Sequence, residues 1–171
     1  MAPSTSQLVF LVSLIVSTSH AIPSATISQI CSKAINPSSC LALLNSAPGV
    51  GSADLKGVGA IVLDAASSKA SQAKSILPSL ASKAGSAALK QRYTDCLEFY
   101  DEAVSDIGDA KQALKANDLD TMNASVSAAQ TYVGDCTDSF DTPPADPSDL
   151  PKRNKDAFDT LSVALVVSNM I

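Results

Sequence analysis

Apolar residues recur at alternating steps of three and four along most of this 171-residue chain. That spacing returns to the same side of an α-helix, and it constrains the fold more than any other feature of the sequence. It runs through four stretches, at residues 55–80, 89–114, 119–140 and 158–168. We therefore predict an all-α fold in which four long amphipathic helices bury their apolar faces against one another.

Short breaks separate the four predicted helices. "APGVGS" at residues 47–52 precedes the first, Asp118 suits the N-cap of the third, and "TPPADPSDLP" at residues 142–151 precedes the fourth. Short connections favour antiparallel neighbours. We expect an up-down-up-down four-helix bundle over residues 52–171, preceded by a helical hairpin over residues 22–48.

The first 21 residues have the pattern of a secretory signal peptide. An apolar run at residues 8–16 is followed by small residues that suit cleavage before Ile22. The alternative is a buried N-terminal helix. Cleavage would remove His20, which is the single histidine of the sequence.

Four cysteines in an exported chain predict two disulfides, with three possible connectivities. Cys31 and Cys40 are close in sequence, and Asn36-Pro37 between them breaks a helix, so a hairpin can bring them together. Cys96 is then left to pair with Cys136. The alternatives for Cys96 are a reactive thiol or a metal ligand, but its acidic neighbours, Asp95 and Glu98, oppose a free thiolate.

Several kinds of chemistry are disfavoured by the composition. A mature chain without histidine and without a CxxC pair excludes Cys–His or Ser–His catalysis and the usual zinc sites, so we expect no metal and no cofactor. The formal charge of -5 argues against nucleic acid as a partner. No later stretch is long enough to anchor the chain in a membrane. Acid pairs that a hydrolase could use are Asp95/Glu98, Asp101/Glu102 and Asp106/Asp109.

Five segments are the most distinctive of the chain: "ICSKAINPSSC", "DLKGVG", "RYTDCLEFYDEAV", "VGDCTDSF" and "LVVSN". Together they resemble the plant invertase and pectin methylesterase inhibitor family, and the likeness runs from about residue 27 to residue 171. The resemblance implies a helical bundle with an N-terminal hairpin and the bonds Cys31–Cys40 and Cys96–Cys136. It also implies secretion to the cell wall, or apoplast, and a non-catalytic one-to-one complex with a carbohydrate-active enzyme.

The branch of the family depends on one short segment. Invertase inhibitors resemble one another in a Pro-Lys-Phe motif, and Leu119-Asp120-Thr121 occupies its place here. This departure favours pectin methylesterase as the target. The matching contact residues are Glu98 and Glu102, one helical turn apart, and Asp138, which we expect the Cys96–Cys136 bond to hold near them. Weaker matches are Ser105 and Asp135.

The sequence is also compatible with other functions. The main alternative is inhibition of cell-wall or vacuolar acid invertase. A secreted structural or storage bundle and an acid-pair hydrolase are more remote. Asn123 begins a glycosylation sequon, although it lies within a predicted helix.

Overall fold

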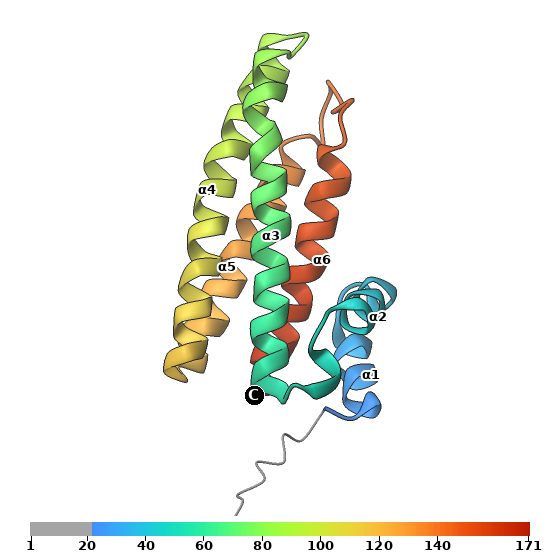
Figure 1. Ribbon diagram of the computed structural model, residues 1–171. Helices are drawn as coiled ribbons and strands as arrows, with labels where there is room; N and C mark the ends of the chain where they lie inside the picture. Colours follow the sequence, from blue (N-terminus) through green and yellow to red (C-terminus); the bar gives the residue numbers. More distant parts are fainter. Residues whose placement is uncertain (1–21) are drawn as a thin grey trace, which may run out of the picture.

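The computed structural model describes residues 22–171, so the predicted signal peptide and His20 lie outside the described residues. The described part is helical, and Figure 1 shows a long bundle with a small hairpin beside its lower half. Within residues 22–171 no helix is both long and apolar enough to cross a membrane.

Four long helices form the bundle: α3 (Leu55–Ser82), α4 (Ala87–Ala116), α5 (Leu119–Asp138) and α6 (Leu150–Ser168). They run alternately up and down, and each packs against two neighbours in the cyclic order α3, α4, α5, α6 (Figure 1). The up-down-up-down prediction is confirmed. Helix α5 ends at Asp138, two residues before the end of the predicted apolar stretch, because the chain turns there and Phe140 packs against Tyr93 instead.

The bundle core follows the predicted periodicity, although some apolar residues of the four stretches are only half-buried. In the stretch at 55–80 these include Ile76 and Leu80, whereas Leu77 between them is fully buried. Leu63 is fully buried as well. Helix α3 packs against both α4 and α6, so its buried face is wider than a single stripe of residues.

The hairpin consists of α1 (Ser24–Lys33) and α2 (Pro37–Ser46), and a short 3-10 helix (Val50–Ser52) leads from it to α3. Helix α1 ends with Ala34 as its C-cap, and Asn36 is the N-cap of α2, where its side chain accepts a hydrogen bond from the Ser39 N–H. The Cys31–Cys40 disulfide joins the two helices, with 5.3 Å between the Cα atoms. The hairpin packs on α6, so it is fixed to one side of the bundle.

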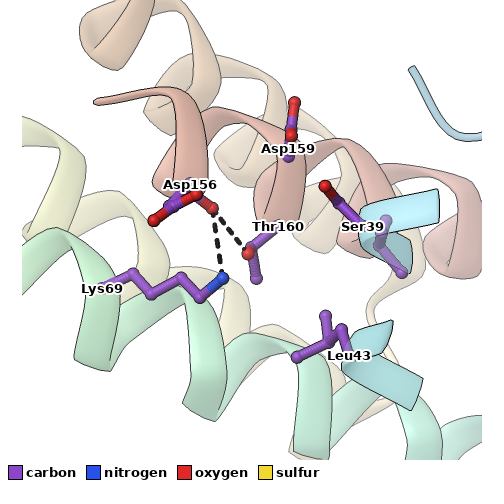
Figure 2. A pocket seen from close by; sticks show the side chains of 7 residues that line it. Ser39, Leu43, Lys69, Asp156, Asp159 and Thr160 are labelled. Carbon is purple, nitrogen blue, oxygen red and sulfur yellow. Dashed lines mark hydrogen bonds between the residues drawn. The ribbon is translucent and has the colours of Figure 1, made fainter. Parts of the chain in front are cut away.

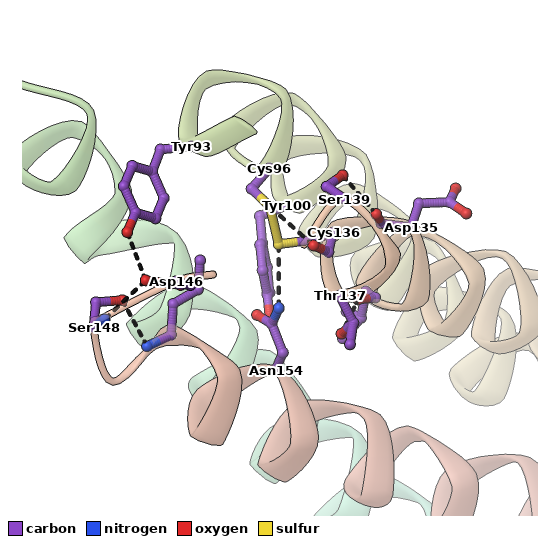
Figure 3. Close-up of a disulfide and its surroundings, with 12 residues drawn as sticks. Tyr93, Cys96, Tyr100, Asp135, Cys136, Thr137, Ser139, Asp146, Ser148 and Asn154 are labelled. Carbon is purple, nitrogen blue, oxygen red and sulfur yellow. Dashed lines mark hydrogen bonds between the residues drawn. A yellow bond between two sulfur atoms is a disulfide. The ribbon is translucent and has the colours of Figure 1, made fainter. Parts of the chain in front are cut away.

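The second disulfide lies inside the bundle. Cys96 on α4 and Cys136 on α5 are joined with 4.8 Å between their Cα atoms, and both are fully buried. Figure 3 shows Tyr100 and Asn154 beside this bond. The Tyr100 hydroxyl donates to Asn154 Oδ1 at 2.8 Å, and Asn154 Nδ2 donates to Cys136 Sγ at 3.2 Å, so α4, α5 and α6 meet at one buried polar cluster.

Candidate functional site

The predicted contact residues of α4 lie on its outer side. Glu98, Glu102 and Ser105 are all exposed, and we call them the α4 acidic face. Their spacing of four and then three residues places them along one line of the helix. Within residues 22–171 neither glutamate has a hydrogen-bond or ion-pair partner, so both carboxylates are available to another molecule.

Helix α4 is held firmly behind this face. Cys96, Tyr100 and Ala103 point into the core and alternate with the exposed acids. Beside the face, Asp101 forms an ion pair with Lys74 of α3. The face is therefore presented by a helix that is fixed by a disulfide, by packing and by a salt bridge.

The potential along the outer side of α4 is negative. Burial, together with repulsion from Asp109 and Glu102, raises the pKa of the Asp106 carboxyl above its usual range. Asp106 Oδ2 is buried and finds no hydrogen-bond partner among the described residues. These acids therefore repel one another in the isolated protein, and a basic partner would relieve that repulsion.

Asp138 belongs to the end of α5 and lies outside the α4 acidic face as defined above. Glu98 and Asp138 each follow a core-facing cysteine by two residues, which is a rotation of about 200° around the helix. Each side chain therefore turns away from the disulfide to the outside of its own helix. Asp138 is exposed and lines a groove with Phe158 and Lys155 of α6.

Asp135 is also exposed and points away from the Cys96–Cys136 bond (Figure 3). Its backbone oxygen accepts a hydrogen bond from Ser139 Oγ at 2.8 Å, which closes the last turn of α5. Asp135 and Asp138 thus lie one turn apart at the end of α5. They form a second acidic area in addition to the α4 acidic face.

The segment that replaces the Pro-Lys-Phe motif forms the first turn of α5. Asp118 is its N-cap, as predicted, and accepts a hydrogen bond from the Thr121 N–H at 3.1 Å. Hydrogen bonds from Thr121 lower the pKa of the Asp118 carboxyl. Leu119 is half-buried, while Asp120 and Thr121 are exposed.

The sequon residue Asn123 is turned towards α6. Its side chain is half-buried, and Nδ2, the atom that would carry a glycan, donates to Ser168 Oγ at 2.9 Å. A glycan at this position would have to break that contact, so the structure disfavours glycosylation of the folded chain.

The loop from Ser139 to Asp149 is tied to α4 by contacts that sequence reasoning missed. The Arg92 guanidinium donates to the backbone oxygens of Thr142, Pro143 and Pro144 at 2.7–3.0 Å. Tyr93 donates to Asp146 Oδ1 at 2.5 Å (Figure 3). These partners are about 50 residues apart in sequence, and no local pattern links them.

A small hollow lies under the hairpin. It lies between α2, α3 and α6, where Lys69 Nζ and Thr160 Oγ1 both donate to the Asp156 backbone oxygen, at 3.5 and 2.8 Å (Figure 2). Its volume of about 20 Å³ admits a single water molecule and no sugar ring. Residues 22–171 also contain no cluster of acids and cysteines that could hold a metal ion.

Comparison with known proteins agrees with this architecture. The family described as plant invertase/pectin methylesterase inhibitor matches residues 25–167. A pectinesterase inhibitor of Actinidia deliciosa is 41% identical over 145 residues, covering 85% of this chain and 78% of the relative. Pectinesterase inhibitor 2 of Arabidopsis thaliana is 34% identical, covering 86% of this chain and 84% of the relative.

A solved structure gives the same result. The crystal structure of a mutant form of a pectin methylesterase inhibitor from Arabidopsis matches with a TM-score of 0.79 and 30% identity. The match covers 85% of this chain and 96% of the solved one. These relatives are named as inhibitors and not as enzymes.

Proposed function

Because this chain belongs to the plant invertase/pectin methylesterase inhibitor family, we propose that it inhibits pectin methylesterase by a stoichiometric, non-covalent complex. The inhibitor covers the active-site cleft of the enzyme and regulates cell-wall pectin. The observation that carries the proposal is the α4 acidic face, whose two glutamates are exposed and unpartnered within residues 22–171. The names of the two relatives support the choice of target.

The rigidity of α4 should strengthen binding through the α4 acidic face. Side chains on a fixed helix lose little conformational entropy on docking. Glu98 and Glu102 can each accept a charge-assisted hydrogen bond from a basic group of the enzyme. Such a bond contributes roughly 1.5–3 kcal/mol where the contact excludes water, and much less at an exposed rim.

Asp138 and Asp135 form the second acidic area of the proposed interface. They lie at the end of α5, close along the chain to Cys136, so the same disulfide that holds α4 also fixes them. An enzyme that spans α4 and the end of α5 meets both areas. Ser105 extends the α4 acidic face by one turn and supplies a hydroxyl instead of a carboxylate.

Acid invertase is the second candidate target, since the matching family includes inhibitors of both enzymes. The first turn of α5 argues against it. A half-buried Leu119 stands there in place of the proline, and Asp120 and Thr121 stand in place of the lysine and the phenylalanine of the Pro-Lys-Phe motif. We expect the protein to leave acid invertase active.

We further propose that the chain is secreted to the apoplast after cleavage before Ile22. Both disulfides suit an oxidising compartment. The pectin substrate of the proposed target is itself a component of the cell wall.

A parallel titration of purified pectin methylesterase and acid invertase with the mature protein tests the proposal. Esterase activity should fall linearly to an end point at one equivalent, with invertase unaffected. The variant carrying Glu98→Lys and Glu102→Lys should inhibit the esterase more than tenfold less well, because two attractive contacts become repulsive. Its helical circular dichroism should be unchanged.

A matched control separates local contacts from net charge. Asp64→Lys with Asp149→Lys makes the same change in charge at exposed positions outside the proposed contacts, where each acid forms only a surface ion pair of small energy. This control should keep most of the inhibition. Equal losses in the two double variants would refute a specific α4 contact, and inhibition of invertase alone would refute the choice of target.

A further inference from the structure

Asp138 lines a groove that has no role in the acidic contacts proposed above. It lies where the tip of the hairpin meets the end of α5 and the first half of α6, and its volume is about 470 Å³. Its walls come from three separate parts of the chain. The residues that shape it are Ile35 from the hairpin, Gly134 and Asp138 from α5, and Lys155, Phe158 and Asp159 from α6.

The groove has an apolar floor and wall. Ile35 is 64% exposed, the highest value among the large hydrophobic residues that the structure describes. Phe158 is half-buried beside it. Gly134 has no side chain, so the floor of the groove is open beside Phe158. A Cβ atom at this position would lie 3.6 Å from Phe158 Cε2, which is an ordinary contact distance, so a larger residue would fill this space. Gathered in one concave place, these groups can bury an apolar side chain.

The wall made by the hairpin is already in position. The Ile35 backbone N–H donates to Ser162 Oγ at 3.0 Å, and Asn36 Nδ2 donates to Asp159 Oδ2 at 2.8 Å. Asp159 is buried and also pairs with Lys155 at 2.7 Å. An occupant therefore meets a preformed groove and need not order the hairpin.

The charges of the groove indicate the chemistry of its occupant. The Lys155 ammonium is compensated by Asp159, whereas the Asp138 carboxylate has no ion pair or hydrogen bond within residues 22–171. The uncompensated charge at the rim is negative. A fitting segment carries an apolar side chain next to a lysine or arginine.

We propose that this groove is a docking site for such a segment on the surface of pectin methylesterase, an inference that rests on the proposed function. Asp138 is part of the proposed interface and forms the rim of the groove, so an enzyme bound at Asp138 also reaches the groove. The hairpin, through Ile35, then takes part in target recognition and does more than complete the fold.

The test compares two exposed apolar residues of the hairpin. Ile35→Ser removes the wall of the groove but keeps the backbone N–H that donates to Ser162. Leu41→Ser removes a residue that is 39% exposed on α2 and does not line the groove. In titrations of pectin methylesterase, Ile35→Ser should inhibit about tenfold less well than the parent, and Leu41→Ser should match the parent.

A second variant fills the groove instead of opening it. Gly134→Leu places a side chain over Phe158 in the last turns of α5, where leucine is a better helix former than glycine. Its melting temperature should equal or exceed that of the parent. Its inhibition should nevertheless be about tenfold weaker or worse, because the space for the enzyme side chain is gone.

The outcomes distinguish this inference from the function on which it rests. If the parent fails to inhibit the esterase, both are wrong. If the parent inhibits and Ile35→Ser and Gly134→Leu inhibit equally well, the groove is not a docking site. If the parent is a dimer in sedimentation and Gly134→Leu is a monomer with full inhibition, a second copy of the chain occupies the groove and the proposal is overturned.

Discussion

The buried polar cluster at the Cys96–Cys136 bond should behave as one unit, and replacing Asn154 by leucine tests this. Asn154 is 1% exposed and accepts the Tyr100 hydroxyl at 2.8 Å. Leucine is similar in volume but accepts nothing, so the Tyr100 hydroxyl is left without a partner in a place that water does not reach. A buried donor without an acceptor costs about 1–3 kcal/mol.

The expected loss for Asn154→Leu is therefore about 2 kcal/mol of unfolding free energy, or about 4–8 °C in melting temperature for a chain of this size. Tyr100→Phe alone should also destabilise, because it leaves the Asn154 oxygen without its donor. The double variant removes both polar groups. It should be no less stable than Asn154→Leu alone, so its loss is smaller than the sum of the two single losses. The difference is a coupling energy of about 1–2 kcal/mol between Tyr100 and Asn154.

Urea unfolding followed by circular dichroism measures all four proteins of this cycle. The slope of the unfolding free energy against urea concentration should be the same for each protein, so that differences in midpoint report differences in stability. The disulfide must stay oxidised throughout. Additive losses in the double variant would show that Tyr100 and Asn154 do not depend on each other, and the reasoning from the buried hydrogen bond would be wrong.

Two further predictions concern the same region. Burial and the hydrogen bond to Asp146 raise the pKa of Tyr93 from 10.0 to about 12. The folded form thus stays neutral where the unfolded form ionises, so unfolding free energy should fall between pH 10 and about 12, and Tyr93→Phe should reduce this fall in rapid alkaline unfolding measurements. Replacing both Cys96 and Cys136 by alanine should lower stability by about 2–5 kcal/mol in urea unfolding, and an unchanged midpoint would contradict the stapling role.

The sequence was sufficient for features that depend on neighbours along the chain. The three-and-four spacing of apolar residues predicted the four bundle helices, and Asp118 before Leu119 predicted where one begins. Asn36-Pro37 predicted the bend of the hairpin and, with it, the Cys31–Cys40 bond. Local geometry and capping decide such features, so a short window of sequence contains the information.

The directions of exposed side chains were only partly predictable. Glu98 and Glu102 fall on the outside of α4, as their spacing indicates. Asp138 lines a groove with residues of α6, which its spacing from Cys136 does not indicate. Counting two residues from Cys136 gives the rotation within its own helix, but the position of α6 is needed to know what that side chain meets.

By itself, then, the sequence determined that this protein is a disulfide-bonded helical bundle with an acidic α4, and its motifs indicated the family. The tertiary structure alone decided that the hairpin rests on α6 through Asp159 and Ser162, and that Arg92 holds the loop before α6. It also decided that Ile35, Gly134 and Phe158 enclose one groove. Periodicity tells which face of a helix is buried, whereas contacts between residues far apart in sequence depend on which neighbour covers that face.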